Sequence, residues 1–355
     1  MLALASNDNT VKIWDVSNGQ CVRTLEGYSY SRYSDSWTVT FSHDLKMLAS
    51  ELNDKTVKIW NISNGQCLQT LMGHSRPVTS IVFSRDSTLL ALVLSNSSVK
   101  VWDKRNGNCL QTFEAYSSPA ISVISVIFSH DSRLLAAGLG DNLANKTFKV
   151  WDINHSQCPQ TLKGHSRSVT SVVFSHDSKV LASASDDKTI KTWDTSNGKC
   201  LQTLKSHRSS ITSVIFSHDS KLLASASNDK TVKVWDTSNA QCLQTLSFEI
   251  VVSVKSLDAT KSVLEIDLGT IHLSLDSSQG PTKPEPKILR FQGYGVSPDC
   301  TWITWNSQNM LWLPPVYRPS AVAVGPSTIS IGCDSGRVLI FNFDSQRLLH
   351  SLIRA

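Results

Sequence analysis

The chain has 355 residues, of which 40% are hydrophobic and 18% are charged, and its formal net charge is +5. This much apolar sequence with so little charge excludes a disordered chain and fits a packed globular fold. No stretch reaches the roughly 18 apolar residues that a membrane-spanning helix needs, and a small positive charge spread over the whole chain does not predict specific nucleic-acid binding.

The first residues do not look like a targeting segment. Residues 1–5 are apolar, but Ser6-Asn7-Asp8 ends this stretch at once and no basic residue precedes it. A secretory signal peptide needs a longer apolar run behind a basic leader. We therefore expect a cytoplasmic protein with no membrane span.

A tryptophan ends a short T-V-K-I-W-like run six times along the chain. The spacings between these tryptophans are 46, 42, 49, 42 and 42 residues, and an aspartate follows five of the six. A period of about 40–45 residues that ends in Trp-Asp predicts an array of four-stranded propeller blades. The six residues are Trp14, Trp60, Trp102, Trp151, Trp193 and Trp235.

Residues 164–205 show the pattern of one blade most clearly. Residues 168–174 are rich in valine, as expected for a strand buried on both faces, and the small residues of 180–185 allow neighbouring sheets to pack closely. Residues 189–194 carry the tryptophan, and residues 200–204 give an outer strand. Polar turns separate the four segments, so the unit predicts three hairpins in one sheet.

On these residues the chain resembles the WD40 family over most of its length. In that family a histidine before the first strand, a serine or threonine, an aspartate and the tryptophan form a hydrogen-bonded tetrad. The resemblance implies a structural role, because a buried indole N–H needs an acceptor. Histidine, serine and aspartate could also indicate a hydrolase, but this set repeats and its serine lies inside a strand. The two complete sets are His165, Ser183, Asp187 and Trp193, and His207, Ser225, Asp229 and Trp235.

Other units depart from the tetrad. The second unit lacks the histidine, the third lacks the serine and the aspartate, and the fourth carries extra residues around 140–145. The first unit begins inside its second strand. The replacements are Tyr28 in the second unit, and Leu92 and Asn96 in the third, which keeps His74 and Trp102.

After residue 247 the repeats decay without ending. We expect an all-β protein, a β-propeller of about seven to nine four-stranded blades. Six WD40 repeats, the first truncated, occupy residues 1–247, and three degenerate blades occupy 248–355, with a proline-rich loop at 281–286. The strands of the degenerate blades are predicted around residues 251–275, 302–305, 310–313, 329–343 and 348–352.

The number of blades leaves two alternatives open. Nine third strands can be counted, and propellers usually close with roughly 4–8 blades. Either a larger ring closes, or the first one or two units belong to a neighbouring propeller.

Cysteine recurs at one position of the outer strand, seven residues after a repeat tryptophan. Zinc sites need close pairs such as C-x₂-C, which are absent, and equivalent strands of adjacent blades are expected to lie too far apart for a disulfide. We interpret these residues as small buried hydrophobes in a reducing compartment. They are Cys21, Cys67, Cys109, Cys158, Cys200 and Cys242.

Histidine and lysine repeat as well. Four histidines lie in F-S-H-D turns, where blade-to-blade distances are expected to be too large for a metal site. The lysines of the D-K-T-V-K runs are interpreted as a solvated edge that discourages strand pairing, with a weak basic rim for acidic partners as the alternative. The residues are His43, His130, His176 and His218, and Lys55, Lys58, Lys188, Lys191, Lys230 and Lys233.

No motif for catalysis or cofactor binding stands out. The chain has no G-x-x-x-x-G-K-[ST] loop, no G-x-S-x-G elbow and no H-E-x-x-H helix. We therefore predict a protein that is not an enzyme, with no catalytic, cofactor-binding or metal-binding residues.

Comparison of two units indicates a binding surface. Residues 164–205 and 206–247 match at 30 of 42 positions, and their sharper differences fall in the loop before the first strand and the turn before the third. Both turns reach one face of a blade, so a fixed scaffold with a varied surface is one interpretation, and drift of exposed turns is the other. The candidate partner-binding residues are Arg76, Arg167, Arg208, Asn53, Asp186 and Asn228.

The near-identity of the S-V-x-S-V-x-F-S-H-D-S-K-L-L-A-S-A-S-x-D-K-T-V-K-V-W-D units resembles the C-terminal WD40 arrays of filamentous-fungal NACHT–WD40 receptors, of the vegetative incompatibility type. The tail, with W-I-T-W at 302–305 and L-W-L-P-P at 311–315, is similar too. The resemblance implies a ligand-sensing propeller that binds protein partners, with an upstream nucleotide-binding domain outside this chain. The alternative is a stand-alone WD40 scaffold for a multiprotein complex, for example in organelle division, ubiquitylation or RNA processing. The sequence names neither partner nor ligand.

Overall fold

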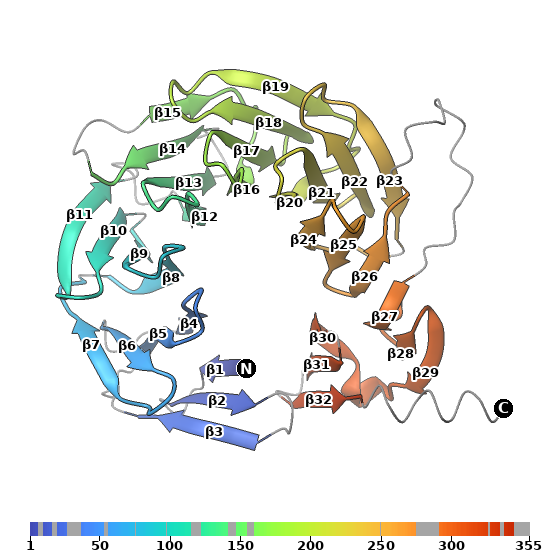
Figure 1. The fold of residues 1–355 in the computed structure, drawn as a ribbon, viewed down its shortest axis with the longest axis horizontal. Helices are drawn as coiled ribbons and strands as arrows, with labels where there is room; N and C mark the ends of the chain where they lie inside the picture. Colours follow the sequence, from blue (N-terminus) through green and yellow to red (C-terminus); the bar gives the residue numbers. More distant parts are fainter. Residues whose placement is uncertain are drawn as a thin grey trace. The chain divides into compact units, whose positions relative to one another are not determined.

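The computed structural model describes residues 1–5, 10–15, 20–26, 37–52, 56–74, 76–96, 98–114, 122–140, 147–154, 160–248, 250–274, 291–325, 327–333 and 337–343. In this part of the chain the strands form eight antiparallel sheets, and the one helix is a short 3₁₀ turn (Figure 1). The predicted all-β propeller class is confirmed, and eight sheets fall within the predicted seven to nine units.

The described chain divides into two compact units, of which the first covers residues 1–15 and 20–205. It holds five sheets, and in each sheet the strands follow chain order. The sheets are β1 (Leu2–Ala5), β2 (Val11–Asp15) and β3 (Gln20–Leu25); β4 (Trp37–Phe41), β5 (Met47–Leu52), β6 (Val57–Asn61) and β7 (Cys67–Leu71); β8 (Val78–Phe83), β9 (Leu89–Leu94), β10 (Ser98–Asp103) and β11 (Asn108–Glu114); β12 (Ser122–Phe128), β13 (Leu134–Gly140), β14 (Thr147–Asp152) and β15 (Gln160–Lys163); and β16 (Val169–Phe174), β17 (Val180–Ser185), β18 (Thr189–Asp194) and β19 (Cys200–Lys205).

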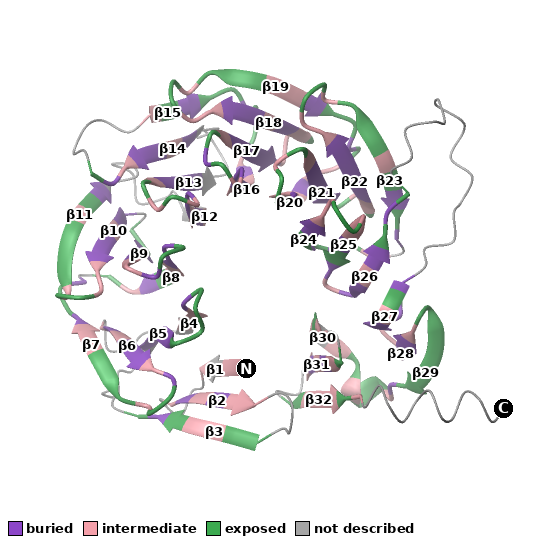
Figure 2. Cartoon of the chain, viewed as in Figure 1, coloured by how far each residue is buried: buried purple, intermediate pink, exposed green. Residues whose placement is uncertain are grey.

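Successive sheets of this unit pack through their inner strands. The first strands contact one another in chain order, β4 with β8, β8 with β12 and β12 with β16. Second and third strands are buried on both faces, whereas the outer strands are exposed over much of their length (Figure 2). The small residues of β17 therefore lie where a neighbouring sheet comes close, as the sequence predicts.

Aromatic contacts join one sheet to the next. The ring of Phe148, on β14, meets the indole of Trp193, on β18, with their centroids 5.2 Å apart in an edge-to-face arrangement. Phe113 instead stacks on Trp151 of the following sheet, with centroids 5.1 Å apart and an interplanar angle of 28°. Such pairs add about 0.5–1.5 kcal/mol to the burial of apolar area. Within the first unit, Trp151 and Trp193 thus support the interface with the preceding sheet.

The second unit covers the described residues from 206 onward. It holds a four-stranded, a six-stranded and a three-stranded sheet, again in chain order. The sheets are β20 (Ile211–Phe216), β21 (Leu222–Ser227), β22 (Thr231–Asp236) and β23 (Cys242–Ser247); β24 (Val254–Asp258), β25 (Val263–Ile266), β26 (Gly269–His272), β27 (Phe291–Val296), β28 (Trp302–Trp305) and β29 (Gln308–Trp312); and, after the 3₁₀ helix η1 (Pro315–Tyr317), β30 (Pro319–Val324), β31 (Thr328–Cys333) and β32 (Val338–Asn342).

The six-stranded sheet joins two of the predicted C-terminal units. Strand β27 pairs with β26 on one side and with β28 on the other, so it takes the place beside β26 that an outer strand has in a four-stranded sheet. Gly269 makes this pairing possible, because a Cβ there would lie 3.2 Å from the Tyr294 carbonyl oxygen. The predicted domain boundary at residue 247 stays a prediction, and the predicted loop at 281–286 and outer strand at 348–352 lie outside the described residues.

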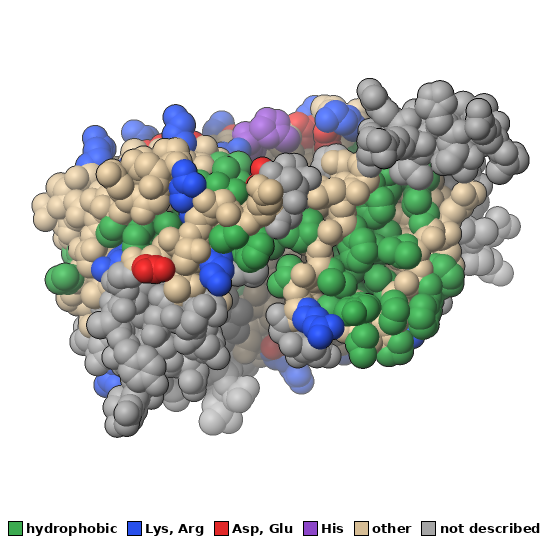
Figure 3. All heavy atoms as spheres, turned by 90° about the horizontal axis from the view of Figure 1, so that it is seen from below, with side chains coloured by type: hydrophobic (Ala, Val, Ile, Leu, Met, Phe, Trp, Pro, Cys, Tyr) green, Lys and Arg blue, Asp and Glu red, His purple; other side chains and the backbone are tan. Residues whose placement is uncertain are grey.

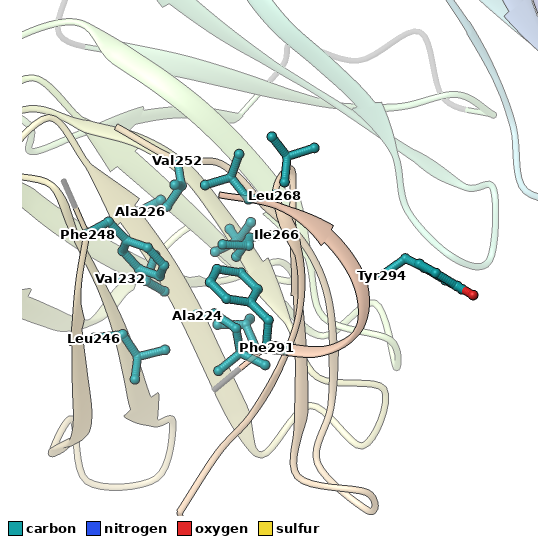
Figure 4. Close-up of a cluster of buried hydrophobic side chains, with 14 of the residues drawn as sticks. Ala224, Ala226, Val232, Leu246, Phe248, Val252, Ile266, Leu268, Phe291 and Tyr294 are labelled. Carbon is teal, nitrogen blue, oxygen red and sulfur yellow. The ribbon is translucent and has the colours of Figure 1, made fainter. Parts of the chain in front are cut away.

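One apolar core runs through the second unit. Side chains of β21, β22 and β23 meet those of β25, β26 and β27, with the Phe248 and Phe291 rings among aliphatic neighbours (Figure 4). The residues shown there include Ala224, Ala226, Val232, Leu246, Val252, Ile266, Leu268 and Tyr294. The sequence repeat decays in this region, but buried apolar positions persist, so packing holds the strands together without the full repeat motif.

Apolar side chains also gather on the surface of the second unit (Figure 3). All five residues of β29 are exposed, among them Met310, Leu311 and Trp312, and Val316 of η1 follows them. In the described part of the chain, no helix is long and apolar enough to cross a membrane.

The interpretation of the repeated cysteines as buried is wrong for those that the structure describes. Their side chains are exposed on the outer strands, and each thiol lies within 3.3–3.6 Å of the carbonyl oxygen two residues later. The reason is that the outer strand has no further sheet over the end where the cysteine lies. The five residues are Cys21, Cys67, Cys109, Cys200 and Cys242; Cys158 lies outside the described residues.

The turn between the third and fourth strands gives the first prediction. Gly198 has φ +71° in this turn, whereas the equivalent Ala240 has φ +63°. A left-handed conformation costs alanine about 1 kcal/mol but costs glycine nothing. We expect Ala240→Gly to raise the free energy of unfolding by about 0.5–1 kcal/mol, measured by urea denaturation.

The matched control is Gly198→Ala, which we expect to destabilise the protein. A Cβ at this position would also lie 2.7 Å from Leu162 Cδ2. A more stable Gly198→Ala variant, or a less stable Ala240→Gly variant, would contradict this account of the turn.

Candidate functional site

In several sheets the loop before the first strand meets the turn between the second and third strands, and we call this the loop edge. In the fifth sheet the Asp186 N–H donates to the Ser168 carbonyl at 3.0 Å, and the Ser185 hydroxyl donates to the Arg167 carbonyl at 3.2 Å. The Asn228 N–H and the Ser210 carbonyl repeat this contact in the sixth sheet, at 2.9 Å. The backbone therefore fixes the two turns against each other.

The first predicted tetrad forms in the fifth sheet. The Trp193 indole N–H donates to Ser183 Oγ at 2.8 Å, and His165 Nε2 lies 2.7 Å from the same oxygen. On its other side His165 Nδ1 lies 3.0 Å from Asp187 Oδ2. The hydroxyl of Thr189 donates to Asp187 Oδ1 at 2.6 Å and extends the predicted set by one residue.

The second tetrad reproduces the first in the sixth sheet. The Trp235 indole N–H donates to Ser225 Oγ at 2.9 Å, and His207 lies 2.8 Å from Ser225 Oγ and 3.0 Å from Asp229 Oδ2. Thr231 again donates to the aspartate, at 2.6 Å. In both sets the serine is fully buried, so a substrate in solution could not reach it.

The tetrad carboxylates are held in their anionic form. Burial of Asp187 would raise its pKa, but hydrogen bonds from His165, Thr189 and the Ser166 N–H outweigh burial and keep the pKa well below its usual range. The same competition lowers the pKa of Asp229 to about 2. Burial lowers the pKa of His207, although Asp229 opposes this shift. At neutral pH the aspartate accepts hydrogen bonds that tie the loop edge together.

The third sheet keeps only part of the tetrad. His74 and Trp102 are both buried and meet edge-to-face with centroids 5.2 Å apart. Leu92 replaces the serine, and the indole N–H of Trp102 has no hydrogen-bond partner among the described residues. Burial and the nearby charge of Lys100 lower the pKa of His74 to about 4, and the Leu71 carbonyl opposes this only weakly. This sheet therefore buries an imidazole and an indole at an energetic cost.

The second sheet keeps the contact between the tryptophan and the serine. The Trp60 indole N–H still donates to Ser50 Oγ, at 2.9 Å. Tyr28 and Asp54, which hold the histidine and aspartate positions in the sequence, lie outside the described residues.

The candidate partner-binding residues lie on loop edges where the structure describes them. Within the first unit Arg76 and Arg167 are exposed, and Asp186 is half-buried; within the second unit Arg208 and Asn228 are exposed. The backbone contacts bring Arg167 to the same edge as Asp186, and Arg208 to the same edge as Asn228. Asn53 lies outside the described residues.

Two exposed lysines belong to the same edges, and the sequence pointed to them only through the alternative of a weak basic rim for acidic partners. Lys188 and Lys230 occupy the turn between the second and third strands, with φ +70° and φ +63°. Their position directly after the tetrad aspartate could have placed them there. Only the fold separates them from other lysines of the D-K-T-V-K runs.

The interpretation of the D-K-T-V-K lysines as a solvated edge is wrong for Lys191 and Lys233, whose side chains bond within the sheet. The ammonium groups of Lys191 and Lys233 donate to Thr203 Oγ1 and Thr245 Oγ1, at 2.8 and 2.9 Å. Lys233 is buried, and Lys58 is half-buried. Lys191 and Lys233 thus tie a third strand to its outer strand, with their alkyl chains along the face of the sheet. Lys55 lies outside the described residues.

The expected separation of the turn histidines is also wrong for one pair. The rings of His130 and His176, in adjacent sheets, have centroids only 4.1 Å apart. Among the described residues, no group of three or more His, Cys, Asp or Glu side chains is placed to hold a metal ion.

The repeat itself identifies the family. The sequence pattern described as "WD domain, G-beta repeat" matches residues 19–61, 65–103, 107–152, 156–194 and 198–236, which together make up more than half of the chain. The chain belongs to the WD40 family. WD40 propellers typically act in protein interactions and not in catalysis. The described tetrads fit this class, since they join strands and turns within each blade.

Part of the chain is similar to a fungal vegetative incompatibility protein. A stretch of 88 residues is 40% identical to the vegetative incompatibility protein HET-E-1 of Podospora anserina. It covers 25% of this chain and 6% of that protein. The chain therefore matches a small part of a much longer fungal WD-repeat protein.

The tetrad gives the second prediction. Ser183→Ala removes the acceptor of the Trp193 indole N–H and the partner of His165 Nε2, so we expect the free energy of unfolding to fall by about 1–3 kcal/mol. Ser166→Ala is the control, since its exposed side chain lies outside the tetrad and only its backbone N–H contacts Asp187. Equal stability of the two variants by chemical denaturation would show that the tetrad adds nothing to this WD40 blade.

The pKa of His74 gives the third prediction. Because burial lowers it from 6.5 to about 4, folding favours the neutral imidazole. Its contribution to stability is complete above pH 6.5 and is lost as the pH falls toward about 4, by about 1–3 kcal/mol. His74→Leu removes this dependence, whereas any contribution of His207 persists in both proteins. Parallel curves of unfolding free energy against pH for the two proteins would refute the assignment.

Proposed function

We propose that this chain is a non-catalytic, ligand-sensing WD40 propeller that recognises a protein partner through its loop edges. One observation carries the proposal. Two sheets of nearly identical sequence differ in charge at exposed and half-buried positions of the loop edge, while their tetrads are the same. In the alignment of the two sheets, Arg167 is equivalent to Ser209, Ser166 to Arg208, and Asp186 to Asn228. A fixed scaffold with changing loop-edge charges fits a surface under selection for binding.

The identity to HET-E-1 supports a more specific proposal. We infer that the chain is the sensor portion of a fungal NACHT-type receptor, acting in the cytoplasm, with a nucleotide-binding domain elsewhere in the protein. The identity covers only a small part of that relative. The support for the receptor role is therefore the shared repeat, together with a loop-edge surface suited to binding a partner.

The reading frame upstream of Met1 tests the receptor assignment. Further WD40 repeats behind a G-x-x-x-x-G-K-[ST] loop would support a nucleotide-gated receptor. A stop codon directly upstream would contradict it and would favour a stand-alone scaffold for a multiprotein complex.

The fourth prediction tests the loop edges directly. We expect the double substitution Arg167→Glu and Arg208→Glu to weaken capture of partner proteins, because both side chains are exposed and reversal replaces attraction by repulsion. The free energy of unfolding should stay within about 0.5 kcal/mol of that of the starting protein, as for other surface substitutions. The measurement is quantitative affinity capture from an extract of the source organism.

The matched control is the double substitution Lys179→Glu and Lys221→Glu. These exposed lysines lie in the turns between first and second strands, away from the loop edge. Partners that are lost with the arginine pair and retained with the lysine pair support the proposal. An unchanged partner set with the arginine pair would overturn it.

A further inference from the structure

Exposed charges on the loop edges of the fifth and sixth sheets are mainly basic. At the loop edge of the fifth sheet Arg167 and Lys188 are exposed, and the half-buried Asp186 is the acid beside them. In the sixth sheet Arg208 and Lys230 are exposed, and Asn228 stands in the place of Asp186. Each unit thus carries this arrangement by itself.

The tetrad aspartates do not offer their carboxylates to a ligand. The two oxygens of Asp187 accept hydrogen bonds from His165, the Ser166 N–H and Thr189, and its side chain is only 6% exposed. Asp229 is held in the same way and is 8% exposed. The acidic groups of the motif are therefore used within the protein, while the cations around them remain exposed.

Backbone conformation gives a separate observation on Lys188 and Lys230. Both lysines occupy the left-handed region, which glycine and asparagine adopt at lower cost. The two sheets nevertheless place the same long cationic side chain there.

We propose that the loop edges bind an acidic peptide segment of a protein partner. Arg167 and Lys188 in the fifth sheet, and independently Arg208 and Lys230 in the sixth, pair with its carboxylates, while Asp186 opposes them. This inference rests on the proposed function, since it names the chemistry of the partner at that same surface.

A peptide fits these edges better than single-stranded nucleic acid. Proteins that bind single strands combine basic grooves with aromatic side chains on which bases stack. At the loop edges of the fifth and sixth sheets, the described aromatic rings are those of His165 and His207, and both are buried. Carboxylate groups need only the exposed cations.

The experiment measures binding of a fluorescent peptide of about 20 glutamates by anisotropy, at low and at physiological salt. We expect Lys188→Asn to weaken binding about two- to fivefold, as for the loss of an exposed ion pair. Asparagine tolerates the left-handed conformation, so this variant should remain folded. Lys179→Asn, in the turn between the first and second strands of the same sheet, is the matched control and should bind like the starting protein.

A second test exchanges the equivalent loop-edge residues Asp186 and Asn228 of the two sheets. Asp186→Asn gives the fifth sheet the residue of the sixth and should tighten binding about twofold, and Asn228→Asp should weaken it by a similar factor. These opposite effects cannot come from general loss of structure.

Three results would overturn the inference. Lys179→Asn could weaken binding as much as Lys188→Asn, the Asp186 and Asn228 exchanges could have no effect, or a single-stranded DNA of 20 nucleotides could bind more tightly than the glutamate peptide. If the glutamate peptide does not bind but the arginine reversal still removes partners, the loop edge is a recognition surface for a partner of other chemistry. If the peptide binds as expected but the partner set survives the reversal, the proposed function fails instead.

Discussion

The buried indole N–H of the repeat tryptophan is the constraint on which the blades depend. The indole lies at the interface with the preceding sheet, where Phe148 contacts Trp193, so its polar atom cannot reach water. An acceptor must come from the second strand, and Ser183, Ser225 and Ser50 supply it. That serine in turn fixes a histidine where the tetrad is complete, and the histidine fixes the aspartate of the turn. One donor thus orders the third strand, the second strand and the loop edge.

This coupling explains why the surface can change while the scaffold does not. The polar groups of a complete tetrad are satisfied within one sheet, so they place no demand on the exposed neighbours. Arg167 and Arg208 point out of loops whose backbones are held by the same contacts in both sheets. Charge at the loop edge can therefore vary at little cost in stability. The third sheet shows the opposite case, because loss of the serine leaves Trp102 without an acceptor among the described residues.

The second unit shows how far a blade can depart from the repeat. Its six-stranded sheet lacks the motif, yet a continuous apolar core runs from β21 to β31. Burial of apolar side chains is non-directional, so it persists when specific hydrogen bonds are lost. Some apolar side chains of this sheet nevertheless stay exposed, namely Met310, Leu311 and Trp312 of β29.

The sequence by itself determined the blades and their tetrads. The period of the tryptophans, the valine-rich first strands and the polar turns predict each four-stranded sheet, because these features depend on local spacing and alternation. The resemblance of the repeat to the WD40 family also implied the pairing of His165 with Ser183 and Asp187, and the structure shows these contacts. Only the tertiary structure decided which repeated side chains are exposed. Cys200 is open to solvent and Lys233 is buried, because exposure depends on what the next sheet covers. Likewise, His130 lies against His176 and β26 pairs with β27, and neither follows from the spacing of residues along the chain. Contacts between sheets depend on how sheets pack, which a local pattern does not encode.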